Sequence, residues 1–219
     1  MGVLKSAVKQ LLIRRRLHGR VTLGGGVRLS KDFRCGQGVS VLDHVTIDRN
    51  VELGDRVRIG RHAYLANLTV GRGSFLESFV LCTGDGSGHI TIGEETYIGL
   101  YGCLDWSNDL TIGSYVHVAG PTTGIWTHTS VHMALYGDPL AERSRRTSAP
   151  VVIEDFVYIG GNCTIYPGVT IGHHCVVLPN SAVSTDLEPY TMVGGVPVKV
   201  IKTLDPKDFR NAPTTPPPR

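Results

Sequence analysis

The sequence predicts an all-β fold, a solenoid of short strands wound around a three-sided apolar column, and three observations support this prediction. Apolar residues recur at every sixth position in two long blocks of the chain. A second, usually smaller residue recurs four positions after each of them. Glycine is abundant, at 27 of 219 residues, while aromatic residues make up only 7%, as expected where tight corners join short strands.

The six-residue period is the stronger of the two patterns. One block reads Leu23, Leu29, Cys35, Val41, Ile47, Leu53, Ile59 and Leu65, and the other reads Ile153, Ile159, Ile165, Ile171, Val177 and Val183. Three such units close a triangular coil, and stacked coils bury a continuous column. A β-sandwich is disfavoured because its alternation has a period of two and no six-residue repeat.

The second inward position and the glycines complete the repeat. The second position is held by Val27, Phe33, Val39, Val45, Val51, Val57 and Ala63, and later by Val157, Cys163, Val169, Cys175 and Ser181. Glycine often follows the first position, as in Ile59-Gly60 and Ile171-Gly172. We expect these glycines to form corners that use their conformational freedom.

The repeat is interrupted in several places, and the longest interruption predicts a functional loop. Short interruptions are the five-residue steps from Leu65 to Val70 and from Leu76 to Leu81, and the segments 84–88 and 106–109. Regularity is lost after Val118 and returns only at Pro150. Residues 129–149 should therefore leave the coil as one long external loop, and such loops commonly carry function.

The two ends of the chain are expected to differ from the coils. Residues 1–20 form an N-terminal cap, in which residues 3–17 are predicted to be a short amphipathic α-helix with Leu4, Val8, Leu11 and Leu12 on one face. This helix either closes the open end of the solenoid or contacts an anionic membrane surface. The β-helix domain spans 21–202, with 198–204 folding back as a strand or turn, and 203–219 is a C-terminal tail, proline-rich and disordered from Pro213.

Composition excludes several classes of protein. No apolar run approaches the roughly 18 residues of a membrane-spanning helix, and Arg14, Arg15 and Arg16 stand where a signal peptide would have its cleavage site. Five cysteines without a CxxC motif indicate reduced thiols and a cytoplasmic location. The net charge of +3 does not indicate nucleic-acid binding.

Two segments resemble the hexapeptide-repeat acyltransferases, in particular the galactoside, maltose and polysaccharide O-acetyltransferases. Residues 151–172 read VVIEDFVYIGGNCTIYPGVTIG, which is similar to the run VxIGxxVxIGxxxxIxPGVTIG of that family, although Glu154 stands where glycine is usual. Residues 193–202 read VGGVPVKVIK and resemble the family's closing GxPAKxIK. The resemblance implies a left-handed parallel β-helix, a homotrimer with active sites between subunits, and acetyl-CoA or another acyl-CoA as co-substrate, with no metal.

The resemblance also implies transfer of an acetyl group to a hydroxyl of a sugar, nucleotide sugar or polysaccharide precursor. This chemistry needs a base near neutral pKa, for which histidine is suited. His128, where the chain leaves the coils, resembles the catalytic position of the family, and His132 is the alternative base. Asp105 and Asn108 are possible helpers that orient the histidine, contact the acceptor or build the corner.

Further site residues follow from the resemblance. The backbone N–H of Gly161 is expected to stabilise the oxyanion. Coenzyme A is expected to contact Gly160, Gly161, Pro179, Ser184, Thr185, Lys199 and Lys202, the two lysines facing phosphate groups. Arg143, Arg145 and Arg146 could supply a further phosphate contact, bind an anionic acceptor or be a solvated charge run. His173 and His174 are expected to be exposed at a corner.

Three other functions stay open at this stage. N-acylation of a nucleotide-linked amino sugar would use the same histidine base. A carbonic anhydrase of the γ class shares the helix, but the spacing of His117, His128 and His132 does not fit its zinc site. A non-catalytic solenoid leaves a long loop beside a histidine unexplained.

Overall fold

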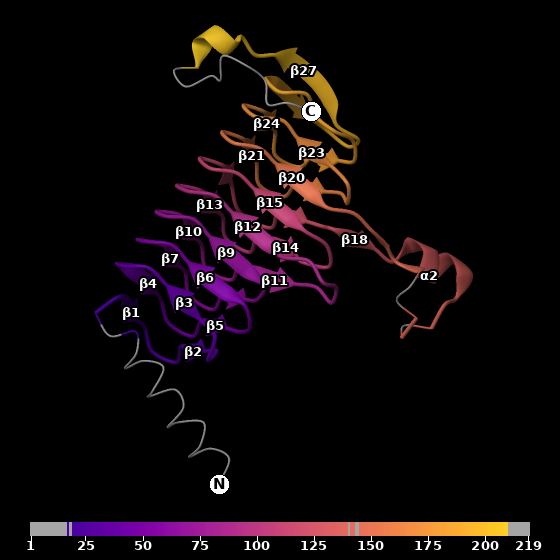
Figure 1. Cartoon of the computed structure of the whole chain (residues 1–219). Coiled ribbons are helices and arrows are strands. Elements are labelled where there is room, and N and C mark those ends of the chain that lie inside the picture. The colour runs from indigo at the N-terminus through magenta and orange to yellow at the C-terminus, as the bar shows by residue number, and fades with distance from the viewer. Residues whose placement is uncertain (1–16, 18, 140, 143–144, 210–219) are drawn as a thin grey trace.

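The chain forms a left-handed parallel β-helix with three sheets, which we name A, B and C, in a computed structural model that describes residues 17, 19–139, 141–142 and 145–209. Successive coils stack along one axis in chain order, so that β1 and β27 lie at opposite ends (Figure 1). The prediction of an all-β solenoid with one external loop is confirmed. The predicted N-terminal helix and the tail from residue 210 lie outside the described residues.

Each coil contributes one short strand to each sheet. Sheet A contains β1 (Val21–Leu23), β4 (Val39–Val41), β7 (Arg58–Ile59), β10 (Phe75–Leu76), β13 (Tyr97–Ile98), β16 (His117–Val118), β21 (Tyr158–Ile159), β24 (Val176–Val177), β26 (Thr191–Gly194) and β27 (Lys199–Thr203). Sheet B contains β2 (Arg28–Leu29), β5 (Thr46–Ile47), β8 (Tyr64–Leu65), β11 (Leu81–Thr83), β14 (Cys103–Asp105), β17 (Gly124–Ile125), β22 (Thr164–Ile165) and β25 (Ala182–Val183). Sheet C contains β3 (Arg34–Cys35), β6 (Val51–Leu53), β9 (Leu68–Val70), β12 (Ile90–Ile92), β15 (Leu110–Ile112), β20 (Val151–Ile153) and β23 (Thr170–Ile171).

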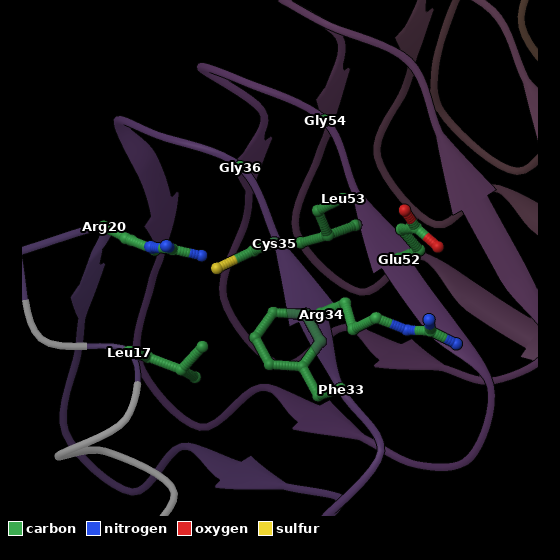
Figure 2. Close-up of a pocket in the computed structure, with 9 residues that line it drawn as sticks. All are labelled: Leu17, Arg20, Phe33, Arg34, Cys35, Gly36, Glu52, Leu53 and Gly54. Atoms are coloured by element: carbon green, nitrogen blue, oxygen red, sulfur yellow. The ribbon is translucent and has the colours of Figure 1, made fainter.

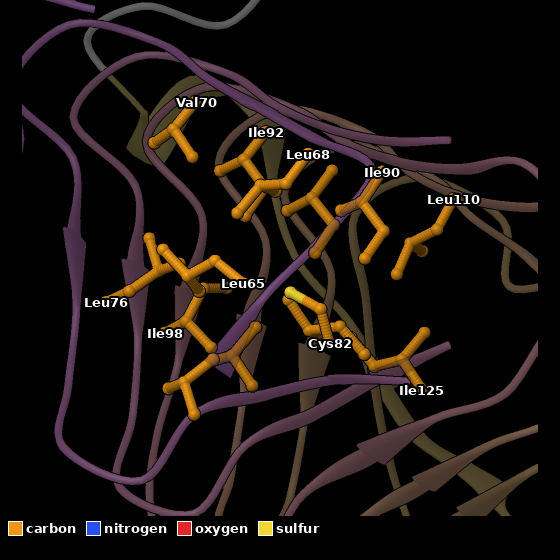
Figure 3. Close-up of a cluster of buried hydrophobic side chains, with 14 of the residues drawn as sticks. Leu65, Leu68, Val70, Leu76, Cys82, Ile90, Ile92, Ile98, Leu110 and Ile125 are labelled. Carbon is orange, nitrogen blue, oxygen red and sulfur yellow. The ribbon is translucent and has the colours of Figure 1, made fainter. Parts of the chain in front are cut away.

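The core is the column of residues that the six-residue repeat predicts. Side chains of the three sheets converge on the interior, for example Leu76, Leu65 and Leu68 from sheets A, B and C (Figure 3). All three are fully buried. Because every coil adds the same kind of layer, neighbouring strands pair in parallel and in register, as Ile98 does with Leu76.

One predicted break in the repeat is wrong. The step of five residues from Leu76 to Leu81 would place Leu81 inside, but its side chain is 43% exposed, while Cys82 is buried. The inward step is therefore six residues, from Leu76 to Cys82, and Leu81 pairs with the outward Tyr64. The predicted five-residue step from Leu65 to Val70 is present, since both side chains are buried.

The reason for the corner glycines also differs from the expectation. Gly60 and Gly160 do not have positive φ angles. A Cβ on Gly60 would lie 2.2 Å from the Ser78 nitrogen of the next coil, and one on Gly160 would lie 2.5 Å from the Pro179 nitrogen. These glycines therefore allow stacked backbones to approach each other. The left-handed residue follows two positions later and is often not glycine, as at His62 (φ 58°) and Asn162 (φ 56°).

The external loop leaves the coil where sheet B meets sheet C. It contains β18 (His128–Thr129), α2 (Val131–Tyr136) and β19 (Thr147–Ser148), and β18 pairs with β19 in antiparallel fashion. The loop with α2 projects sideways from the stack (Figure 1). At the far end, β27 turns back onto β26 and is followed by a short 3-10 helix, η2 (Pro206–Asp208). Among the described residues no helix has the length and apolar character needed to cross a bilayer.

Candidate functional site

His128 and Asp105 form a hydrogen-bonded pair at the base of the external loop. The Nδ1 atom of His128 lies 2.6 Å from Oδ2 of Asp105. The Asp105 side chain is fully buried, whereas that of His128 is 20% exposed. A carboxylate can only accept hydrogen bonds, so Nδ1 carries the proton and Nε2 is left with a free lone pair. The pair therefore presents a histidine whose tautomer suits a general base.

Asp105 is held in its charged form by several donors. Its Oδ2 also accepts hydrogen bonds from the backbone N–H groups of Thr127 (2.9 Å) and His128 (3.1 Å), and its Oδ1 accepts one from the Ser107 N–H (2.9 Å). Burial alone would raise the pKa of Asp105, but these hydrogen bonds outweigh it and hold the pKa below its ordinary value. The carboxylate is thus ionised near neutral pH.

The local fold explains why residues 23 positions apart meet. Asp105 ends β14, and β17 lies beside β14 on the next coil, with Leu104 opposite Ile125. The chain after Ile125 therefore passes directly over the end of β14. Thr127 is buried and donates from Oγ1 to the Asp105 carbonyl at 3.2 Å. Thr127 was not predicted as a site residue, because no sequence pattern sets it apart from other threonines.

Asn108, the other predicted helper, does not contact His128. Its backbone N–H donates to Oγ1 of Thr127 (2.9 Å), its Oδ1 accepts from the Asp109 N–H (2.8 Å), and its Nδ2 donates to Oγ of Ser148 (3.3 Å). Because Ser148 pairs with His128 across β18 and β19, Asn108 braces the strand beside the histidine. Of the alternatives for Asn108, building the corner fits these contacts.

His132, the alternative base, lies in α2 and is exposed. Its ring stacks on Tyr136 one turn further along the helix, with ring centroids 5.3 Å apart. No described carboxylate forms an ion pair with it, in contrast to His128. The geometry of a buried carboxylate partner therefore distinguishes His128 from His132.

The loop is fastened to the coils by an ion pair. Nη1 of Arg146 lies 2.5 Å from both carboxylate oxygens of Asp85, in the 84–88 segment of an earlier coil. Both side chains are less than one-third exposed, and Arg146 stands directly before β19. Arg145 makes a longer and more exposed pair with Asp138 at 3.6 Å, and Arg143 lies outside the described residues.

Gly160, Gly161 and Pro179 meet on the edge between sheets A and B. A Cβ on Gly160 would lie 2.5 Å from the Pro179 nitrogen, and one on Gly161 would lie 2.5 Å from the Gly120 carbonyl oxygen. Both positions therefore require glycine for close approach. Gly161 is half-buried and Pro179 is exposed.

The N–H of Gly161 is left available by its neighbour on the next coil. At the equivalent position of other coils, a side chain of the next coil accepts this hydrogen bond. These contacts are Gly25 to Asp43 (2.8 Å), Gln37 to Asp55 (2.7 Å), Arg61 to Ser78 (3.1 Å), Glu94 to Ser114 (3.1 Å) and Ser114 to Asp155 (2.7 Å). Pro179 occupies that place above Gly161 and has no acceptor, and no described residue accepts from the Gly161 N–H. This donor can therefore serve a ligand.

The remaining predicted coenzyme A contacts lie on the last coils. Lys199 and Lys202 are both exposed on β27. Three positions apart on a regular strand they would face opposite sides, but a register shift pairs Lys199 with Gly194 and Lys202 with Met192. These partners are two residues apart, so both lysines point to the same side. Ser184 and Thr185 are exposed after β25, on the edge between sheets B and C.

The predicted site residues do not form one cluster within a single chain. His128 follows β17 at the edge between sheets B and C, whereas Gly161 follows β21 at the edge between sheets A and B. Ser184 and Thr185 are likewise on a different edge from Gly161. Asp105 and His128 come together, as do Gly160, Gly161 and Pro179.

The expectation that His173 and His174 are exposed is wrong. They are 7% and 4% exposed, with their Nδ1 atoms 3.0 Å apart. His174 stacks between Phe156 and Tyr190, and Phe209 packs against its ring. Burial, followed by the neighbouring His173, lowers the pKa of His174. Among the described residues no group of three or more His, Cys, Asp or Glu side chains is arranged to hold a metal ion.

Comparisons with known proteins agree with this architecture. Residues 150–185 match the family model for the bacterial transferase hexapeptide, six repeats. The galactoside O-acetyltransferase of Escherichia coli is 31% identical over 140 residues, which cover 64% of this chain and 66% of that protein. LpxA from Acinetobacter baumannii has the same fold, with a TM-score of 0.66 at 17% identity, covering 84% of this chain and 67% of that one.

A longer relative matches over part of its length only. The bifunctional protein GlmU of Acinetobacter baumannii is 28% identical over 185 residues, which cover 77% of this chain but 38% of that protein. The chain thus spans little more than a third of the length of this relative. The repeat, the coiled core and these similarities together show that the chain belongs to the hexapeptide-repeat acyltransferase family.

Proposed function

We propose that this protein is an acyltransferase that moves an acetyl group from acetyl-CoA to a hydroxyl group of a sugar or polysaccharide precursor. The observation that carries the proposal is the Asp105–His128 pair at the base of the loop, since a buried carboxylate orients a partly exposed imidazole. The similarity to the galactoside O-acetyltransferase supports a sugar hydroxyl as the acceptor.

In the proposed reaction, Nε2 of His128 takes the proton of the acceptor hydroxyl as its oxygen attacks the thioester carbonyl carbon. The tetrahedral oxyanion is stabilised by the N–H of Gly161, which has no other acceptor among the described residues. The intermediate then expels the thiolate of coenzyme A, which takes the proton from His128. Asp105 stays ionised throughout and stabilises the imidazolium that forms.

The site is completed by a second copy of the chain in this proposal. His128 and Gly161 lie on different edges of one solenoid, so one subunit would supply the histidine and its neighbour the oxyanion donor. A homotrimer closes this arrangement with three equivalent sites. Lys199 and Lys202, which share one side of β27, would attract the phosphate groups of acyl-CoA. A cytoplasmic location, where acyl-CoA is made, is part of the proposal.

The test is an assay with acetyl-CoA and a panel of acceptors. The panel contains sugars and oligosaccharides with free hydroxyls and nucleotide sugars with a free amine; release of free thiol reports turnover, and mass spectrometry identifies the product. Ester formation supports O-acylation, and amide formation would replace it by N-acylation with the same base. The absence of any product across the panel, with the protein folded, would overturn the proposal.

Two histidine variants assign the base. His128→Ala is expected to lower kcat by roughly 10²–10⁴-fold, while the matched variant His132→Ala leaves kcat within about twofold. If His132→Ala abolishes turnover and His128→Ala does not, the assignment is wrong.

A further inference from the structure

Charge is distributed very unevenly along the solenoid. Residues 1–76 contain 14 Lys and Arg against 5 Asp and Glu, a net charge of +9, whereas residues 77–219 contain 8 against 14, a net charge of −6. Because the coils stack in chain order (Figure 1), the excess of Lys and Arg among the described residues 17–76, 9 against 5 Asp and Glu, lies at one end of the axis. The first-coil end is therefore basic, and the excess of Asp and Glu lies on the coils that follow it, since residues 77–176 contain 10 Asp and Glu against 3 Lys and Arg, whereas residues 177–219 contain 4 against 5.

Three arginines without an ion pair among the described residues surround the first coil. Arg20, Arg28 and Arg34 are exposed, and none forms an ion pair with a described residue. They lie on different sides of the coil, before β1, on sheet B and on sheet C. On the following coils four arginines form ion pairs, Arg49 with Asp48 (3.9 Å), Arg56 with Glu95 (3.7 Å), Arg61 with Asp43 (3.3 Å) and Arg72 with Glu94 (2.5 Å). Arg58 instead lies over the Phe75 ring, 4.8 Å from its centroid.

The same end is hollowed. A cavity of about 500 Å³ lies against Leu17, Phe33 and Leu53, with Arg20, Arg34 and Glu52 among its other lining residues. Figure 2 shows Leu17 and Phe33 on the floor of this hollow, Arg20 reaching across it, and Arg34 pointing outward. An apolar floor below exposed guanidinium groups is complementary to an amphiphile with an anionic head group.

The sequence that precedes the first coil is likewise both basic and apolar. Leu17, the first described residue, lines the hollow. Residues 3–17 combine the apolar Leu4, Val8, Leu11 and Leu12 with Lys5, Lys9 and the run Arg14-Arg15-Arg16. Basic and apolar residues in one short segment favour a surface of anionic lipid over a purely polar polyanion.

We propose that the first-coil end, defined by Arg20, Arg28, Arg34 and the hollow beside Leu17, docks on an anionic membrane surface. The basic residues bind lipid phosphate groups, and the apolar residues in the sequence before Leu17 add affinity for the interface between head groups and acyl chains. The acidic coils point away from the surface, because like charges repel them from it. This proposal stands apart from acyl transfer, since it uses none of the residues assigned to that reaction.

The experiment measures co-sedimentation of the full chain with vesicles. The vesicles contain either phosphatidylcholine alone or phosphatidylcholine with about one-third phosphatidylglycerol, at about 0.1 M and about 0.5 M NaCl. Binding is expected only to the anionic vesicles and is expected to fall strongly at the higher salt concentration. Equal binding to both vesicle types, or none to either, would overturn the proposal.

Two matched triple variants locate the surface. Arg20→Gln, Arg28→Gln and Arg34→Gln together are expected to lower partitioning to anionic vesicles at least about tenfold, since each such residue near the surface contributes substantially. Arg49→Gln, Arg61→Gln and Arg72→Gln remove the same number of charges from paired positions and should change partitioning less than about threefold. Equal losses of partitioning in the two variants would mean that binding depends on the net charge of the protein and not on the first-coil end. This result would contradict the proposal.

A third variant separates a membrane from other partners. Leu11→Asp with Leu12→Asp should weaken binding to anionic vesicles and leave binding to immobilised heparin, a soluble polyanion, unchanged. If both kinds of binding are unchanged, the partner is a polyanion and the membrane proposal fails. Self-association between the basic first-coil end and the acidic coils of another molecule, detected by light scattering without lipid and lost in the first triple variant, would also overturn it. Acetyl transfer to a soluble acceptor should be retained in the first triple variant, so a failure of the proposed function is recognised separately.

Discussion

The edge between sheets A and B and the edge between sheets B and C are built from the same repeat but differ in regularity. Between sheets A and B, the chain turns in four or five residues on every described coil. Between sheets B and C, three successive coils are enlarged at the segments 84–89, 106–109 and 126–150. The step between buried inward residues is 6 residues from Ile47 to Leu53, but it is 10 from Cys82 to Ile92, 8 from Leu104 to Ile112 and 28 from Ile125 to Ile153. The enlarged segments carry Asp85, Asn108 and His128. The regular edge maintains the stack, and the irregular edge supplies most of the side chains that are candidates for catalysis.

The enlarged segments also support one another. Asp85 in the first binds Arg146 in the third, and Asn108 in the second binds Ser148 in the third. Asp105, immediately before the second segment, binds His128 at the start of the third. The first two interruptions of the repeat therefore both brace the third, and the loop is fixed relative to the rigid column rather than left free.

Apart from the loss of His128 itself, the largest expected effect of a single change at the irregular edge is that of Asp105→Asn. The amide cannot accept hydrogen bonds in the same pattern, so the favoured His128 tautomer is lost, and kcat should fall by roughly 10³-fold. Steady-state kinetics of the folded variant measure this effect. Asp109→Asn is a matched control on the same edge without a contact to His128, and a comparable loss there would contradict the specific role of Asp105.

A change in the regular column should act on stability instead. Ile98→Ala removes most of a fully buried side chain and is expected to lower the free energy of unfolding by roughly 2–5 kcal/mol. Chemical denaturation measures this loss, and kcat below the transition should stay near that of the unchanged protein. A loss of kcat in the fully folded variant would show that the column and the site are not separable.

The tether between the two segments should have an intermediate effect on catalysis. Arg146→Met breaks the pair with Asp85 that fastens β19, which is the partner of the His128 strand. We expect kcat to fall by roughly 3–10-fold and KM for acyl-CoA to change less. The reason is that the variant disturbs the orientation of the histidine but leaves the contacts of the substrate in place. Arg145→Met, whose ion pair is more exposed, is the control and should have little effect; equal effects would contradict a tethering role.

The smallest expected effect concerns the edge between sheets C and A, where His174 is buried. Because its folded-state pKa lies below the ordinary value of 6.5, the unfolded chain binds the proton more readily. Above pH 6.5, His174 is neutral in both states and does not change the free energy of unfolding with pH. As pH falls below 6.5 toward the lowered pKa, the unfolded chain takes up the proton first, so the free energy of unfolding decreases. His174→Phe, which retains the ring stack, should reduce this loss in thermal melts between neutral and mildly acidic pH. An unchanged pH dependence would contradict the assignment.

Much of the fold could be predicted because its signal is local and repeated. The residues from Leu29 to Leu65 that follow the six-residue period lie inward as expected, because each coil adds one layer of apolar side chains to the core. The pairing of Asp105 with His128 was one of the alternatives that the sequence offered. The segment lengths indicated where the column is interrupted, and therefore where to look for the site.

Other features depend on contacts that the linear pattern does not contain. Leu81 and Cys82 are both apolar, and only the register with β14 determines which one faces inward. Lys199 and Lys202 share a side because of a bulge. His174 is buried by rings from neighbouring coils and by Phe209. The N–H of Gly161 is available because the next coil places Pro179 above it, which spacing alone does not reveal.

The most direct test of the account is a mixing experiment with two impaired variants, His128→Ala and Gly161→Ala, the second of which would bring a Cβ within 2.5 Å of the Gly120 carbonyl oxygen. If His128 of one subunit works with Gly161 of its neighbour, trimers assembled from both variants contain some intact sites. Co-refolding of equal amounts should then restore about a quarter of the unchanged protein's turnover, as random assembly of a closed ring predicts. Turnover no greater than the average of the two separate variants, in trimers shown to be mixed, would contradict a site shared between subunits.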